Sequence, residues 1–171
     1  IHGDHHMPSS GPLLVLANHP GMTDTVALLA ALAGRPDLRV IAGDRPFLRA
    51  LQHVAPALIL LPEGGGAQLQ VLRAAVAHLQ RGGALLTFPA GCIEPDPATF
   101  GRHQALESLQ RWSDSMVLLA RRVPQTRWLV ALVSNVVSAQ TQGHPLTALR
   151  RRAADKQKLA AALQVAMPRY Q

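Results

Sequence analysis

The chain has 171 residues, of which 48% are hydrophobic and 16% charged, a composition that fits a compact globular protein and excludes a charge-rich disordered chain. Its 17 Lys and Arg residues against 10 Asp and Glu give a formal net charge of +7, which favours an anionic partner, while the 4% aromatic content argues against nucleic acid. The single cysteine excludes an internal disulfide framework and is typical of a reducing compartment.

Apolar runs in the first half of the chain predict strands that alternate with helices. Leu13–Ala17 is a short continuous apolar run after a Pro/Gly turn cluster, which is typical of a buried parallel strand. The polar loop 18–24 follows, and the Ala- and Leu-rich stretch 25–33 predicts a helix that ends at Gly34. The next expected elements are a strand at 38–42, a short helix at 47–53, a strand at 57–61, a glycine loop at 64–66, a helix at 67–81 and a strand at 84–88.

The second half continues the alternation and indicates the fold class. It predicts a loop at 89–97, helices at 103–112 and 116–122, a strand at 128–137 and a terminal helix at 146–165. Alternating strands and helices predict an α/β fold with a mostly parallel (mixed) sheet flanked by helices, in one domain over residues 1–171. Ligands of such sheets bind beyond the carboxyl ends of the strands, so we expect the functional site in the loops that follow strands.

The loop after the first strand contains a histidine and an aspartate five positions apart. On one continuous helix they would point about 140° apart and would not meet. Pro20 and Gly21 let His19 stay at the strand end while Asp24 falls in the first helical turn and faces back. Such a carboxylate would fix the tautomer of an imidazole that acts as a general base. The alternative is a capping aspartate beside an ordinary loop histidine.

Three stretches together resemble one enzyme family. Asn18–Asp24 resembles the N-H-x4-D motif of the glycerolipid acyltransferase superfamily, the relatives of lysophosphatidic acid acyltransferase. Leu85–Gly91 is similar to the Phe-Pro-Glu-Gly block of that family, and Trp128–Ser134 to its later apolar block. The order and spacing of the motifs agree from about residue 11 to residue 134.

The resemblance implies a function and a mechanism. It implies a glycerol-3-phosphate acyltransferase-like fold and an O-acyltransferase of phospholipid biosynthesis, which moves a fatty acyl group from acyl-CoA or acyl-carrier protein to a lysophospholipid or related lipid acceptor. His19 would be the general base and Asp24 its orienting partner, with no metal and no cofactor besides the thioester co-substrate. The alternative is a non-catalytic lipid or acyl-carrier binding module with the same fold.

The departures from the family pattern concern the acceptor. Pro62 stands where the second block usually ends in an arginine that holds the acceptor phosphate, and Ala90 replaces the usual glutamate of the third block. Both departures argue against recognition of a glycerol 3-phosphate type of acceptor. Either Arg45 or Arg49 replaces, from a different position in the chain, the arginine that is missing at position 62, or both are ordinary surface arginines.

Further candidate residues lie in and beside these motifs. The candidate substrate-binding residues are Asn18, Phe88, Pro89, Gly91 and Glu94. Glu94 either substitutes for the missing block-three carboxylate or is a solvated loop residue. Cys92 is expected to pack as a small buried hydrophobe rather than to act as a nucleophile.

The expected location is the cytoplasmic side of the cell membrane. The terminal helix at 146–165 combines the basic run Arg150–Arg152 with apolar positions, so it either lies on an anionic lipid surface or docks on the core with a wet face. The longest apolar stretch, residues 26–33, is far below the roughly 18 residues of a membrane span. Because the chain begins at Ile1 rather than Met, we expect that an N-terminal membrane anchor is missing upstream.

Overall fold

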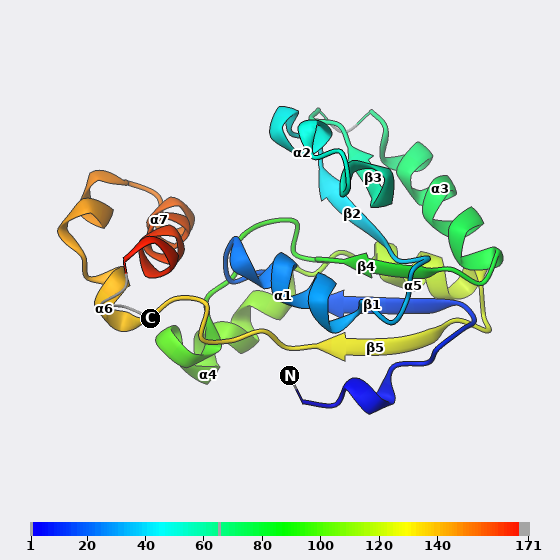
Figure 1. Ribbon diagram of the computed structural model, residues 1–171, viewed down its shortest axis with the longest axis horizontal. Helices are drawn as coiled ribbons and strands as arrows, with labels where there is room; N and C mark the ends of the chain where they lie inside the picture. Colours follow the sequence, from blue (N-terminus) through cyan, green and yellow to red (C-terminus); the bar gives the residue numbers. More distant parts are fainter. Residues whose placement is uncertain (1, 65, 168–171) are drawn as a thin grey trace. The chain divides into compact units, whose positions relative to one another are not determined.

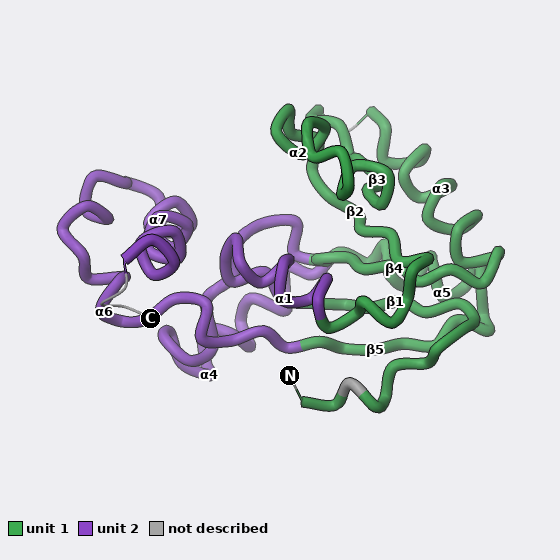
Figure 2. The backbone as a smooth tube through the Cα atoms, viewed as in Figure 1, with its two compact units in different colours: residues 1–17, 31–89, 113–131 green, residues 18–30, 90–112, 132–171 purple. Residues whose placement is uncertain are grey.

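The computed structural model describes residues 2–64 and 66–167, so residue 65 of the expected glycine loop lies outside the described residues. The chain forms two compact units, each built from three segments (Figure 2). Unit 1 consists of residues 1–17, 31–89 and 113–131, and unit 2 of residues 18–30, 90–112 and 132–171. The expectation of a single domain over the whole chain stays a prediction.

The sheet of unit 1 has five strands in the order β3-β2-β4-β1-β5 (Figure 1). The strands are β1 (Leu13–Ala17), β2 (Arg39–Gly43), β3 (Leu58–Leu61), β4 (Ala84–Thr87) and β5 (Arg127–Ala131). Every described pairing is parallel, and Leu13 lies level with Ala84 on one side and with Arg127 on the other. The α/β class is thus confirmed.

The centre of the sheet is the core of unit 1. All five residues of β1 are buried, and so are the first three of β4, as expected for central parallel strands that read as continuous apolar runs. Helix α3 (Gln68–Gln80) packs on β3 and β4 and beside α5 (Ser115–Arg122), while α2 (Pro46–Ala50) follows β2. A short 3-10 helix spans Asp4–His6 and another spans Ala55–Ala57.

A buried arginine ties together the turns that precede β1 and β4. Arg35 is 2% exposed and its guanidinium donates to the carbonyls of Pro8, Gly11 and Gly82 at 2.9–3.1 Å. Two further bonds of 2.8 Å reach the carboxylate of Asp37, and they lower the pKa of that carboxyl below its usual value. Arg35 therefore holds the amino-terminal edge of the central strands.

Unit 2 is built from the segments that follow β1, β4 and β5 in the chain. Its helices are α1 (Thr23–Ala31), α4 (Pro97–Ser108), α6 (Ala139–Gln142) and α7 (Ala153–Ala166), with 3-10 helices at Leu109–Arg111 and Pro145–Leu149. Val136 and Val137 pack with Ala160 and Ala161 of α7 in a buried apolar cluster. In the described part of the chain, no helix combines the length and the apolar character needed to cross a bilayer.

The strand predicted at 128–137 ends at Ala131, six residues early. Side chains, not a neighbouring strand, take the backbone N–H groups that follow. The amide oxygen of Asn18 accepts from Val133 at 2.7 Å, and the buried carboxylate of Asp96 accepts from residues 135–137 at 2.7–3.1 Å. With those donors satisfied, the segment needs no strand pairing to be buried.

Two predicted helices differ in extent from the structure. α4 begins at Pro97, because Asp96 caps it by accepting from the N–H of Ala98 and proline suits the first helical position. Non-helical backbone at Gly101 (φ 84°, ψ 164°) separates this added first turn from the part that coincides with the helix expected at 103–112. The terminal helix expected at 146–165 is interrupted, because Arg150 and Arg152 have extended backbone angles between the 3-10 helix and α7. The arginine run therefore lies in a connector, not on an amphipathic helix.

Candidate active site

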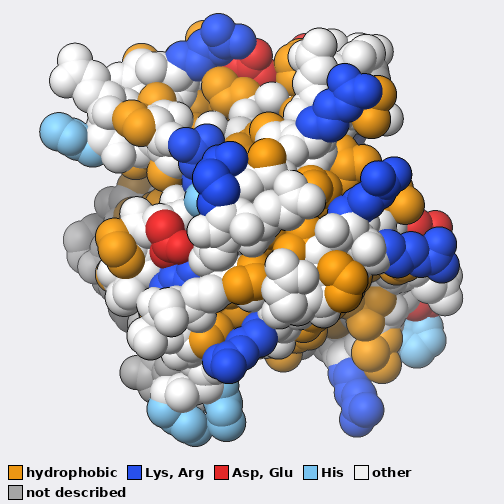
Figure 3. Space-filling view, turned by 90° about the vertical axis from the view of Figure 1, so that its right-hand side faces the viewer, with side chains coloured by type: hydrophobic (Ala, Val, Ile, Leu, Met, Phe, Trp, Pro, Cys, Tyr) orange, Lys and Arg blue, Asp and Glu red, His pale blue; other side chains and the backbone are white. Residues whose placement is uncertain are grey.

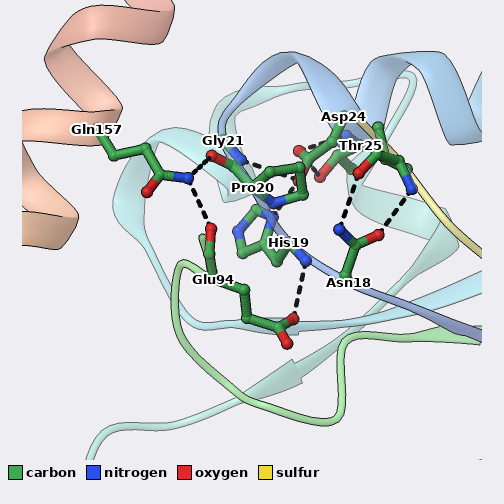
Figure 4. A network of polar contacts seen from close by, with 9 residues as sticks. Asn18, His19, Pro20, Gly21, Asp24, Thr25, Glu94 and Gln157 are labelled. Atoms are coloured by element: carbon green, nitrogen blue, oxygen red, sulfur yellow. Dashed lines mark hydrogen bonds and ion pairs between the residues drawn. The ribbon is translucent and has the colours of Figure 1, made fainter. Parts of the chain in front are cut away.

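The loop that follows β1 places an imidazole against a carboxylate. Nδ1 of His19 lies 2.6 Å from Oδ2 of Asp24, the contact that Pro20 and Gly21 were expected to allow (Figure 4). Asp24 is in the first turn of α1 and is fully buried, whereas the His19 side chain is 27% exposed. The histidine thus has a buried anchor behind it and remains accessible from outside.

The surroundings of Asp24 define which nitrogen of the imidazole carries a hydrogen. The backbone N–H of Gly21 donates to Oδ2 at 3.2 Å, and the backbone N–H of Thr25 donates to Oδ1 at 2.6 Å. An ionised carboxylate only accepts, and its position in the first turn of α1 is the favourable one for a negative charge. These contacts suit the tautomer in which Nδ1 of His19 donates to Asp24 and the lone pair is on Nε2.

Glu94 clamps the backbone of His19 from the loop after β4. The N–H of His19 donates to Oε2 of Glu94 at 2.9 Å, and the N–H of Glu94 donates to the carbonyl of His19 at 2.9 Å. Oε1 of Glu94 accepts from the hydroxyl of Ser108 at 3.0 Å and from the indole of Trp112 at 2.8 Å. The carboxylate is fully buried, so its interpretation as a solvated loop residue is wrong.

Helix α7 braces the same loop from the other end of the chain. The side-chain amide of Gln157 donates to the carbonyl of Pro20 at 2.5 Å and to that of Glu94 at 2.6 Å (Figure 4). Gly21 packs so closely that a Cβ there would lie 2.5 Å from Cγ1 of Val136 and 3.3 Å from Cβ of Ala161. The loop is therefore held by close packing as well as by hydrogen bonds.

The other predicted site residues are placed differently. Asn18 is buried and holds both the N–H and the carbonyl of Val133, at 2.7 and 2.8 Å. Gly91 has a positive φ of 63°, and Phe88 and Pro89 belong to unit 1. The expectation of a buried Cys92 is wrong, because this thiol is exposed. The substrate-binding roles of Asn18, Phe88, Pro89, Gly91 and Glu94 stay predictions.

The arginines considered as displaced cations are engaged in ion pairs within unit 1. Arg45 pairs with Glu63, and Nε of Arg49 donates to Asp44 at 2.7 Å. The second pairing lowers the pKa of Asp44 and raises that of Arg49. On the face shown in Figure 3, cationic side chains are scattered among hydrophobic ones rather than gathered in one patch. Among residues 2–64 and 66–167, no group of three His, Cys, Asp or Glu side chains is placed to hold a metal ion.

The family follows from a comparison with known proteins, and the fold and the site agree with it. In an α/β protein, a buried carboxylate next to a partly exposed histidine suits general-base chemistry. The family model described as Acyltransferase matches residues 1–124, and the chain belongs to this family, within the glycerolipid acyltransferase superfamily. It is therefore an acyltransferase. Searches among curated proteins and among solved structures returned no match.

Sequence reasoning missed the residues that support the pair. Gln157 stands in a helix outside the matched range, and nothing in its neighbourhood marks it as different from a surface glutamine. Ser108 and Trp112, which donate hydrogen bonds to Glu94, also could not be identified from the sequence. They stand 14 and 18 residues after Glu94, and no local pattern connects them to it. Asp96 did carry a signal: an aspartate directly before a proline is typical of a helix start.

Proposed function

We propose that the protein transfers a fatty acyl group from a thioester donor, acyl-CoA or acyl-carrier protein, to a hydroxyl of a lysophospholipid or related lipid acceptor. One observation supports this most strongly: the 2.6 Å contact of His19 with buried Asp24, in a chain of the Acyltransferase family. The imidazole is accessible and oriented, which are the two requirements for a general base.

The chemistry follows from the tautomer. Nε2 of His19 takes the proton from the acceptor hydroxyl as its oxygen bonds to the thioester carbonyl carbon. The imidazolium that forms is stabilised by Asp24, which already accepts the Nδ1 hydrogen. When the tetrahedral intermediate collapses, the carbon–sulfur bond breaks and the imidazolium returns its proton to the departing thiolate. The products are an ester and a free thiol, and His19 ends in its starting state.

The remaining parts of the proposal concern location and partners. We place the enzyme at the cytoplasmic, inner face of the cell membrane, in peripheral contact with anionic lipid. The net charge of +7 supports attraction to such a surface, at about 1 kcal/mol per cation near it. The proposed reaction gives no role to a metal or a bound cofactor.

The test compares three variants with acyl-CoA and a mixed pool of lysolipids, with mass spectrometry of the products. His19→Ala and Asp24→Asn should each lower the rate of ester formation by about 10²- to 10⁴-fold. His103→Ala is the control, because that side chain is 87% exposed on α4 and should leave the rate unchanged. Treatment with a chelator should also leave it unchanged.

Two outcomes would contradict the proposal. Wild-type rates in folded His19→Ala would exclude the histidine as the base. Intact thioesters with every acceptor, together with measurable lipid binding, would favour a non-catalytic binding module instead. Circular dichroism of each variant separates loss of chemistry from loss of fold.

A further inference from the structure

Unit 2 has an open pocket of about 430 Å³ beside the histidine loop. Its volume is in the range of small-molecule sites. The lining residues are Met22, Arg150, Asp155, Lys158, Leu159 and Ala162. Met22 belongs to the loop between His19 and Asp24, and the other five come from α7 and the connector before it. The catalytic loop thus forms one wall of the pocket.

The packing of α7 explains why the pocket forms there. Residues 155, 158, 159 and 162 are spaced by three or four positions and share one helix face. Gln157 and Ala161, which point to another side of the helix, fix it to Pro20 and Gly21. The pocket therefore lies along a helix that is anchored to the loop carrying the general base.

The charges of the pocket favour an anion. Nζ of Lys158 is 3.8 Å from Oδ1 of Asp155, with both side chains nearly half exposed, so this pair is weak. Arg150 makes no ion pair with any residue in the described ranges. The pocket therefore holds two cations, Arg150 and Lys158, and one carboxylate, Asp155. The planar guanidinium of an arginine can donate two parallel hydrogen bonds to one phosphate group.

The rest of the lining is apolar. Met22 is 58% exposed, and Leu159 is partly exposed near Ala162 on α7. A ligand that fits must therefore combine a negative head with an apolar part. A free inorganic anion would make no apolar contact with Met22, Leu159 and Ala162.

We propose that this pocket binds the phosphate ester of one of the two substrates of the transfer reaction, with Arg150 and Lys158 as the phosphate ligands. The proposal rests on the function proposed above and names a recognition element for it. Phosphate esters occur both in a phosphorylated lipid acceptor and in the CoA or phosphopantetheine part of the donor. Both sources present the same chemistry to the pocket, and experiment distinguishes them.

The test measures binding by calorimetry in the His19→Ala background, so that no turnover occurs. One probe pair is a short-chain monoacylglycerol phosphate and the same monoacylglycerol without phosphate. The other pair is CoA and pantetheine. We compare Arg150→Gln/Lys158→Gln with Arg151→Gln/Lys156→Gln, which removes the same two charges from neighbouring residues outside the lining.

In one of the two pairs, the phosphorylated member should bind at least about tenfold more tightly than its partner, which is about 1.4 kcal/mol. The pocket variant should abolish this difference and the control should retain it. Ala162→Trp, which fills the pocket without a change of charge, should weaken the same probe. The pair that discriminates identifies the source of the phosphate.

The inference would be overturned by equal binding within both pairs, by an equal loss in the control variant, or by full binding in Ala162→Trp. These outcomes are separate from failure of the proposed function, because binding is measured without turnover. An inactive wild-type protein with phosphate binding intact would refute acyl transfer and leave the pocket in place. A protein that transfers acyl groups, but whose pocket does not distinguish the phosphorylated probes, would support acyl transfer and refute the pocket.

Discussion

Replacing Glu94 by glutamine tests whether the clamp on His19 stabilises the fold. The glutamate uses both oxygens as acceptors, one for the N–H of His19 and the other for Ser108 and Trp112. A glutamine has only one oxygen. In one orientation its NH2 group faces the N–H of His19, and in the other it faces the indole N–H of Trp112, so one of these donors loses its acceptor. One unsatisfied donor costs about 1–3 kcal/mol in the free energy of unfolding.

The assay is urea denaturation followed by tryptophan fluorescence. With a slope of about 2 kcal/mol per M, a loss of about 2 kcal/mol lowers the urea midpoint by about 1 M. Glu107→Gln is the matched control, since Glu107 is 61% exposed on α4 and its replacement should stay within about 0.5 kcal/mol of wild type. If both variants unfold at the same urea concentration, the clamp does not contribute as described.

Two more predictions follow from close packing and from charge. Gly21→Ala should cost about 1–3 kcal/mol in the free energy of unfolding and should also lower activity, because the new Cβ meets the stiff side chain of Val136 at 2.5 Å. A thermal melt measures the first effect and a transfer assay the second. An unchanged melting temperature would contradict the prediction. Arg35 lowers the pKa of Asp37 in the folded state, so their pairing stabilises the fold above the ordinary value of 3.8 and the benefit is lost as pH falls below it. Asp37→Asn should therefore cost less than about 1 kcal/mol at pH 7, since the carboxylate is 41% exposed. It should also make acid unfolding below the ordinary value of 3.8 less steep than in wild type. A parallel pH series of melts on both proteins measures the difference, and identical acid profiles would exclude the assigned role of the pair.

Local patterns were sufficient where local forces decide the structure. The run Leu13–Ala17 is buried along its whole length, and the strand has the bounds that the sequence predicts. The pairing of His19 with Asp24 was also readable, because Pro20 and Gly21 restrict how the chain leaves a strand. Both conclusions depend on residues within a dozen positions of one another.

Sequence reasoning failed where a distant side chain decides the structure. The apolar stretch after β5 has the pattern of a strand, but Asn18 and Asp96 bind its N–H groups from other parts of the chain. The arginine run 150–152 follows a turn in which the hydroxyl of Thr147 bonds to the carbonyls of Gln142 and His144, and helical periodicity contains no trace of that turn. Burial of Glu94 likewise requires knowledge of which segments surround it.

The brace formed by Gln157 has a consequence for genetics. Its amide holds the carbonyl of Pro20 in the histidine loop and that of Glu94 in the loop after β4, from a position 137 residues after Pro20 in the chain. A random screen for inactive alleles should consequently return hits among the codons of α7, a helix that carries none of the motifs resembling the acyltransferase family. Such alleles would disturb the loop of His19 while leaving both His19 and Asp24 unchanged in sequence.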